Sequence, residues 1–223
     1  MKLGYRINPS ERYVSQEIVE AYREIPTSII SDCMERLFAM DSKIRPFHPK
    51  PKIVGHAITI HCPPGDNLVL QKAIEMAESG DVLVMNAGGD TTQSPVGEIV
   101  VSNCIRRGAV GLVIDGPIRD SDILPTLAIP VFAKGVTHRG CYKDGPGEIN
   151  VIIACGGVVV RPGDLVVGDD DGVVIVPYEE AEGLLPKLMQ KVEQEEQTLE
   201  QIRNKTIDRS WVDQELRDKG YTF

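Results

Sequence analysis

The sequence predicts an α/β fold, with a parallel sheet, flanking helices and an antiparallel β layer. Two observations carry this prediction. Between residues 81 and 136 the chain alternates short apolar runs with amphipathic stretches, and the resulting order of strand, helix, strand, helix and strand is typical of parallel sheets. After Gly135 the chain changes to β-branched runs separated by turn signals, which is typical of antiparallel strands.

The N-terminal part is expected to be helical. Apolar residues recur at helical spacing within residues 10–37, which predicts two helices. Ser10 is a candidate cap for the first helix, and Thr27 or Ser28 for the second. The prolines of residues 41–52 then predict an extended loop.

The middle of the chain supplies the predicted parallel strands. Its first helix is expected between a cap at Asp66 and a stop at Gly80, and Gly108 stops the next helix. Strands are predicted at 53–62, 81–89, 109–116 and 129–136, with helices at 66–79, 94–107 and 119–127.

The C-terminal part is expected to add the antiparallel layer and then charged helices. Residues 147–177 hold several glycine-containing turn signals between β-branched runs, and "GDDDG" at 168–172 is interpreted as a hairpin turn because it lacks the later glutamate of a calcium loop. One or two helices are predicted at 178–205. We expect a single domain over 1–223, with an arm at 1–20 and a polar tail at 206–223.

Composition excludes several classes of protein. The 223 residues carry a net charge of -9 with no basic footprint, so nucleic-acid binding is not expected. No apolar run approaches the roughly 18 residues of a membrane span, and the N-terminus lacks the apolar core of a signal peptide. A cytoplasmic protein is therefore expected. The five cysteines form no CxxC pair, so neither a disulfide framework nor a zinc site is predicted.

Two loops follow neighbouring predicted strands and should face one cleft, because sites in α/β sheets form at the carboxyl ends of strands. In the first loop, residues 97–100 (Gly97, Glu98, Ile99, Val100) lie near a helix start, where N–H groups can bind an anion. In the second loop, Asp120 can bind a hard divalent cation, and Arg119 can hold a carboxylate through two parallel hydrogen bonds. Together these groups would suit a 2-oxo acid.

Two simpler interpretations stay open at this point. Glu98 could also be an ordinary first-turn glutamate, whose negative charge interacts favourably with the helix dipole. Arg119 and Asp120 could form an ordinary surface ion pair. No GxGxxG or GxxxxGK[ST] motif is present, so a nucleotide-binding loop is not expected.

The order of these motifs resembles a known family. Glu98, twenty further residues and then Arg119-Asp120 are similar to the acidic–X20–Arg–Asp signature of the RraA-like family. That family includes 4-hydroxy-4-methyl-2-oxoglutarate aldolases and regulators of ribonuclease activity, and some members are labelled demethylmenaquinone methyltransferases. The likeness covers roughly residues 20–205 and includes "SGDVLVMNAGG", "RRGAVGLVIDGPIRD" and "IPVFAKGVTHRG". The segment "DTTQSP" before Gly97 differs from the sequence expected of the aldolases.

The resemblance implies a swivelling β/β/α layered domain that assembles as homotrimers or homohexamers with sites between subunits. It implies that Asp120 binds Mg²⁺ or Mn²⁺, that Glu98 acts partly through metal-bound water, and that Arg119 holds the pyruvyl group. The last helix of a neighbouring subunit would complete the metal shell through Glu195 or Glu196. The implied activity is a metal-dependent pyruvate aldolase, with oxaloacetate decarboxylation as a side reaction. The alternative is a non-catalytic, protein-binding regulator of ribonuclease.

Overall fold

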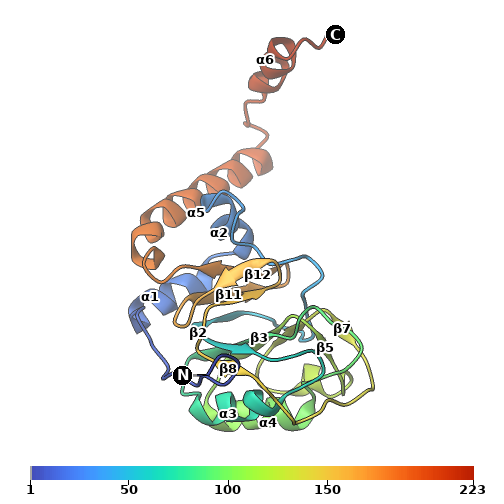
Figure 1. Ribbon diagram of the computed structural model, residues 1–223. Helices are drawn as coiled ribbons and strands as arrows, with labels where there is room; N and C mark the ends of the chain where they lie inside the picture. Colours follow the sequence, from blue (N-terminus) through green and yellow to red (C-terminus); the bar gives the residue numbers. More distant parts are fainter. Residues whose placement is uncertain (1) are drawn as a thin grey trace.

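The computed structural model describes residues 2–223, and a mixed sheet lies at its centre (Figure 1). The strand order is β1-β6-β4-β3-β2-β11-β12, and β8 also pairs with β2. These strands span Arg45–Pro46 (β1), Ile53–His61 (β2), Asp81–Asn86 (β3), Gly111–Ile114 (β4), Val131–Ala133 (β6), Glu148–Ile149 (β8), Leu165–Asp169 (β11) and Gly172–Val176 (β12). Two short pairs lie outside it: β5 (Pro117–Ile118) with β7 (Gly135–Val136), and β9 (Ile153–Cys155) with β10 (Val158–Val160).

The parallel half of the sheet consists of β2, β3, β4 and β6. Helices α3 (Leu68–Met76) and α4 (Glu98–Arg107) cover one face of it (Figure 1). Because successive strand residues point to opposite faces, Leu83 and Met85 belong to the apolar cluster under these helices, whereas Val82 and Val84 belong to the cluster on the other face.

The antiparallel half is the hairpin of β11 and β12, which Figure 1 shows above β2 and β3. Strand β2 joins the halves, since it runs parallel to β3 and antiparallel to β11. Val166, Val173 and Ile175 of the hairpin share an apolar cluster with residues of β3. Two β layers therefore face one another with helices outside them, which confirms the predicted α/β fold of a β/β/α layered domain.

A second set of helices packs on the outer face of the hairpin: α1 (Gln16–Ala21), the 3-10 turn Tyr22–Glu24, α2 (Thr27–Cys33) and the beginning of α5 (Ala181–Arg203). The Tyr22 hydroxyl donates a hydrogen bond to the Ala181 carbonyl at 2.8 Å. The tip of the hairpin caps α2, because Asp169 accepts hydrogen bonds from the Thr27 N–H at 2.8 Å and the Thr27 hydroxyl at 2.6 Å. The "GDDDG" segment is thus a hairpin turn, as predicted.

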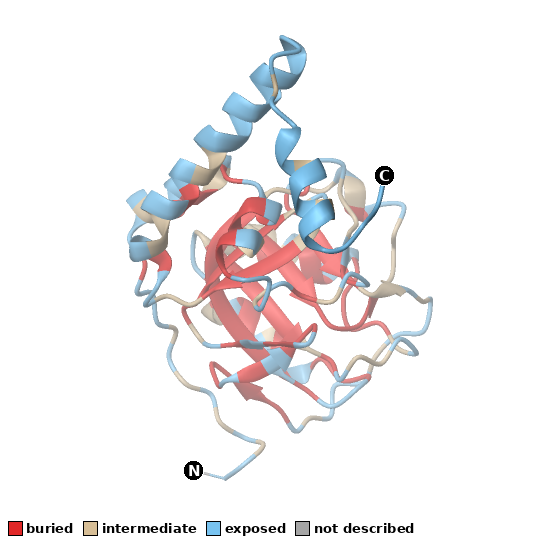
Figure 2. Ribbon diagram, turned by 90° about the horizontal axis from the view of Figure 1, so that it is seen from above, coloured by how far each residue is buried: buried red, intermediate tan, exposed pale blue. Residues whose placement is uncertain are grey.

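The chain ends in two helices that leave the body of the molecule. The second half of α5 and all of α6 (Ser210–Asp218) project away from the sheet (Figure 1), and their residues are largely exposed (Figure 2). The sequence predicted residues 206–223 only as a polar tail. Side-chain pairs between Gln214 and Asp218 and between Glu215 and Lys219, each four residues apart, support a helix there instead.

The first helix begins later than predicted. Helix α1 starts at Gln16, and Ser15, not Ser10, is its cap, because the Ser15 hydroxyl accepts a hydrogen bond from the Ile18 N–H. The residues before it are held without helical structure. Arg12 among them forms a bidentate ion pair with the buried Asp81 at the start of β3, with a shortest distance of 2.6 Å.

The helix predicted at 119–127 is also wrong. Only the 3-10 turn Leu124–Thr126 forms there. Asp120 has a φ of +55°, which is not helical, and Pro125 lacks the N–H that a helix needs. None of the helices within residues 2–223 is long and apolar enough to span a membrane.

The N-terminal arm is tied to β8. Arg6 donates two hydrogen bonds to the buried Glu148 carboxylate, at 2.5 and 2.9 Å, and the Gly4 N–H donates a third at 2.9 Å. The Ile149 N–H donates to the Arg6 carbonyl at 2.9 Å. The hydrogen bonds from Arg6 lower the pKa of Glu148 to about 2. A charged contact therefore fixes the arm on the body.

Replacing Arg6 by glutamine is expected to reduce stability at neutral pH and to flatten its loss in acid. The pKa of Glu148 is about 2 in the folded chain and is roughly 4.3 for an unperturbed glutamate. The pair therefore stabilises the fold above pH ~4.3, and this contribution disappears as the pH falls toward 2. Urea denaturation of both proteins at several pH values measures the difference.

The difference between wild type and Arg6→Gln should shrink between about pH 5 and pH 2. Arg23→Gln is the matched control, because Arg23 forms its ion pair with the exposed Glu20 and this pair should contribute less than ~1 kcal/mol. A stability difference that stays constant over this pH range would contradict the assignment.

Candidate active site

The two loops singled out in the sequence lie side by side at the carboxyl edge of the parallel strands. Val96 and Ile118 form a parallel bridge, and the Arg119 N–H donates to the Val96 carbonyl at 2.9 Å. The Glu98 N–H, at the start of α4, donates to Asp120 Oδ2 at 3.0 Å. The structure thus brings Gly97, Glu98, Arg119 and Asp120 together.

Asp120 caps the start of α4 through its hydrogen bond with the Glu98 N–H. Its backbone is in the left-handed region, which is uncommon for residues other than glycine and asparagine and is often found at functional sites. Its Oδ2 lies 3.6 Å from Arg119 Nε, but both side chains are more than a third exposed, so this pair adds little stability. Neither the cap nor the ion pair accounts for the strained backbone at an exposed position.

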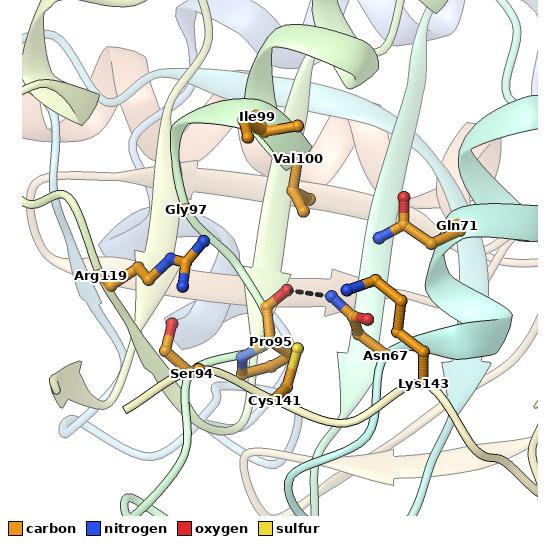
Figure 3. Close-up of a pocket in the computed structure, with 11 residues that line it drawn as sticks. Asn67, Gln71, Ser94, Pro95, Gly97, Ile99, Val100, Arg119, Cys141 and Lys143 are labelled. Atoms are coloured by element: carbon orange, nitrogen blue, oxygen red, sulfur yellow. Dashed lines mark hydrogen bonds between the residues drawn. The ribbon is translucent and has the colours of Figure 1, made fainter. Parts of the chain in front are cut away.

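Arg119 borders a small cavity of about 160 Å³ (Figure 3). Such a volume would hold roughly five water molecules. Four residues predicted to bind a substrate line it, and seven further residues complete the lining. The predicted ones are Gly97, Ile99, Val100 and Arg119; the others are Asn67, Gln71, Ser94, Pro95, Gly140, Cys141 and Lys143.

The floor of the cavity is the beginning of α4. The N–H groups of the first helical turn have no acceptor within the helix, and the helix dipole is positive at this end. Ile99 and Val100 lie in that turn and line the cavity. The Arg119 guanidinium lies beside Gly97, directly before this turn (Figure 3), so this end of the cavity is suited to a carboxylate.

The opposite wall carries Asn67 and Lys143 (Figure 3). Asn67 is buried, and its Nδ2 donates to the Pro95 carbonyl at 2.8 Å, while its Oδ1 has no hydrogen-bond partner within residues 2–223. Lys143 is exposed and adds a positive charge. Cys141 lies between Arg119 and Lys143 (Figure 3), and partial burial raises the pKa of its thiol.

Close packing requires a glycine at position 97. A Cβ atom there would lie 2.4 Å from Asp120 Oδ2 and 2.9 Å from Arg119 Cγ. A Cβ at Gly140 would lie 3.2 Å from Arg119 Nη1. The backbone therefore approaches Arg119 closely on two sides and limits where its side chain can go.

The two predicted acidic residues, Glu98 and Asp120, do not line this cavity. Glu98 is exposed and does not line it, and Asp120 borders an adjoining hollow that also includes His138. Within residues 2–223 no three His, Cys, Asp or Glu side chains are close enough to hold a metal ion. Glu195 and Glu196 lie on α5, at the opposite end of the molecule from α4 (Figure 1).

The donor set nevertheless suits Mg²⁺ or Mn²⁺. Both cations prefer oxygen ligands, and Mg²⁺ usually keeps several waters while it is bound through one or two carboxylates. Asp120 and Glu98 provide two carboxylates at one exposed edge, linked through the Glu98 N–H bond to Asp120. A further ligand would have to come from outside this chain.

Comparisons with known proteins show what the chain is similar to. A family model described as RraA-like, Aldolase/RraA, matches residues 27–175. A protein of Halalkalibacterium halodurans named "Putative 4-hydroxy-4-methyl-2-oxoglutarate aldolase" is 41% identical over 175 residues, which are 78% of this chain and 83% of that protein.

Solved structures give the same fold under a different name. Streptomyces coelicolor RraAS2, described as an unusual member of the RNase ES inhibitor RraA protein family, has a TM-score of 0.77 and 30% identity, covering 84% of this chain and 98% of its own. The RNA-processing inhibitor RraA from Thermus thermophilus has a TM-score of 0.64 and 27% identity, covering 69% and 93%. The relatives' names thus point both to an aldolase and to an inhibitor.

Proposed function

The chain belongs to the RraA-like family, and on that premise we propose that it is a divalent-metal-dependent lyase that releases pyruvate from 4-hydroxy-4-methyl-2-oxoglutarate or a related 2-oxo acid. The observation that carries the proposal is the position of Arg119. Its guanidinium borders a small polar cavity whose floor is the start of α4. A structural ion pair would have no need of such a cavity.

The substrate's 2-oxo acid end is assigned to the floor of the cavity. Its carboxylate would accept hydrogen bonds from N–H groups in the first turn of α4 and from Arg119, whose planar fork matches a carboxylate. The distal carboxylate would face Lys143. The hydroxyl group would donate a hydrogen bond to Asn67 Oδ1, which has no partner among the described residues.

A divalent cation fits the same edge. Asp120 would bind it directly, and Glu98 would bind it through water. The third acidic group is assigned to Glu196, or to Glu195, of a partner subunit in a homotrimer or homohexamer, because in one chain these residues lie far from Asp120. When bound, the cation supplies Lewis-acid stabilisation of the developing enolate oxygen.

The protein's own groups then act on charge and position. In the retro-aldol step the hydroxyl at C4 passes its proton to a water molecule, its oxygen becomes the carbonyl oxygen of one pyruvate, and the bond between C3 and C4 breaks. The electron pair of that bond passes to the 2-oxo group as the enolate of pyruvate, and protonation at C3 gives a second pyruvate. Arg119 places a fixed positive charge where this negative charge develops. The same enolate would form on loss of CO₂ from oxaloacetate.

The direct test is an assay of pyruvate release. The protein, with Mg²⁺ or Mn²⁺, is incubated with 4-hydroxy-4-methyl-2-oxoglutarate and, separately, with oxaloacetate, and each reaction is repeated with a chelator. Metal-dependent release from at least one substrate is expected. Absence of release from both, with and without metal, would contradict the proposed reaction.

A second candidate function is a protein-binding regulator of ribonuclease without chemistry. The observation in its favour is that structures of the same fold are described as inhibitors of RNA processing. Pull-down with a ribonuclease, performed with wild type and with Arg119→Lys, separates the two. Binding that is unaffected by the substitution, together with no pyruvate release, would favour the regulator.

Replacing Gly97 by alanine is expected to lower kcat/KM at least about tenfold, because small displacements of positioned groups are costly. The added methyl would displace Asp120 and Arg119, whereas the extended backbone at Gly97 accepts alanine without strain. Steady-state kinetics and a melting curve measure the effects. Gly183→Ala is the control, since its Cβ would meet no atom within 4 Å. Equal kinetics for the two variants would contradict the close packing.

A further inference from the structure

The wall that carries Asn67 and Lys143, called the distal wall from here on, contains no helix or strand. Lys143 belongs to an irregular segment between β7 and β8, residues 137–147, and Asn67 precedes α3. A wall of this kind holds its shape only if other groups fix its backbone. The groups that do so determine where Asn67 and Lys143 stand relative to each other.

One buried carboxylate joins the two parts of this wall. Asp66 is 5% exposed, and its Oδ1 accepts a hydrogen bond from the Leu68 N–H at 2.8 Å. Its Oδ2 accepts from the N–H groups of Asp144 and Gly145, at 2.6 and 2.9 Å. These three donors flank the two wall residues, because Leu68 follows Asn67 and Asp144 follows Lys143.

Backbone contacts extend the same connection. The Asn67 N–H donates to the Tyr142 carbonyl at 3.0 Å, and the Tyr142 N–H donates to the Gly65 carbonyl at 2.7 Å. Gly65 and Asn67, the residues on either side of Asp66, are thus both paired with Tyr142. A buried carboxylate is stable here because three N–H groups surround it.

We propose that Asp66 is a positioning residue that fixes Lys143 against Asn67 and thereby selects substrates with a distal carboxylate. This inference rests on the proposed function. Asp66 does not line the cavity, so it would act through the two residues that do. An asparagine at this position has only one acceptor oxygen for three N–H donors and brings two N–H groups of its own. The wall should then loosen while the floor at α4 stays unchanged.

The experiment compares two reactions in Asp66→Asn. Cleavage of 4-hydroxy-4-methyl-2-oxoglutarate requires both ends of the cavity, whereas exchange of the methyl protons of pyruvate for deuterium requires only the floor. We expect KM for cleavage to rise about tenfold, as for a misplaced binding group. The rate of proton exchange should stay within about twofold of wild type.

Asp164→Asn is the matched control. Asp164 is also buried and also accepts backbone hydrogen bonds, from the N–H groups of Arg161 at 2.8 Å and Tyr178 at 3.2 Å, but these two partners neither line the cavity nor adjoin a residue that does. It should lower the melting temperature without a change in the KM for cleavage. Equal losses of cleavage and exchange in Asp66→Asn, or an unchanged KM, would overturn the proposal.

Two additions keep the test decisive. If Asp66→Asn does not fold, Asp66→Glu retains the charge and is measured instead. In the double variant with Lys143→Met, KM should rise no further than in the worse single variant, and additive losses would argue against a shared mechanism. If wild type catalyses neither reaction, the proposed function has failed. Calorimetric binding of oxalate and of 2-oxoglutarate then tests the role of Asp66 alone. Only 2-oxoglutarate, which has a distal carboxylate, should bind more weakly to the variant, and equal weakening for both ligands would overturn that role.

Discussion

Replacing Asp120 by asparagine is expected to reduce metal-dependent pyruvate release to the background level while the chain stays folded. Asparagine can still accept the hydrogen bond from the Glu98 N–H and tolerates the left-handed backbone at this position. What it removes is the negative charge that a divalent cation requires. Release of pyruvate with saturating Mg²⁺ or Mn²⁺ measures the activity, and a melting curve measures the fold.

Asp120→Ala provides the comparison. It removes the charge and also the cap of α4, so it should lose the same activity and about 1 kcal/mol more stability than asparagine. Glu98→Gln should have the smaller kinetic effect, because Glu98 is assigned to the cation only through water. Full metal-dependent turnover in Asp120→Asn would show that this carboxylate is not the metal ligand.

The meeting of the two loops could be predicted because it depends on local patterns. A glycine-ended strand followed by a helix start, repeated on neighbouring parallel strands, places both loops at one edge of the sheet. Gly97 and Arg119 follow from this rule once the strands β3 and β4 are identified. The left-handed conformation of Asp120 could not be predicted, because residues other than glycine and asparagine adopt it uncommonly and no local sequence pattern indicates it here.

The distal wall could not be predicted for a different reason. Asn67 and Lys143 are 76 positions apart in the sequence, and neither belongs to a strand of the parallel sheet. The segments that carry them are joined by hydrogen bonds of Asp66, which the sequence indicated only as a helix cap. Asp66 does bind the Leu68 N–H as a cap would, but its second oxygen makes the long-range contacts.

Long-range contacts also explain the misplaced helix starts. Ser10 and Ser15 are both good caps, and local sequence cannot choose between them. The ion pair of Arg12 with Asp81 holds the residues before Ser15 on the body, so the helix begins after Ser15. The assembly of several chains is likewise outside the reach of local patterns, and it stays a prediction drawn from the family resemblance.

Replacing Arg119 by lysine is expected to lower kcat/KM by roughly 100-fold or more, comparable to the loss of a preorganised oxyanion donor. Lysine keeps the positive charge but lacks the planar fork that can hold a carboxylate through two parallel hydrogen bonds. Arg119 is 43% exposed and its contact with Asp120 is long, so the substitution should change the free energy of unfolding by well under ~1 kcal/mol. Its effect should therefore be almost entirely kinetic.

The two interpretations of Arg119 differ most clearly in this variant. If Arg119 only pairs with Asp120 on the surface, lysine can replace it and kcat/KM stays near the wild-type value. If it holds the pyruvyl group, the loss should appear in both cleavage and deuterium exchange, because both pass through the enolate at the floor of the cavity. Arg106→Lys is a suitable control, since Arg106 forms an exposed ion pair with Glu75 on the same layer of helices. A near-wild-type rate in Arg119→Lys would mean that the cavity beside Arg119 is not where the enolate forms.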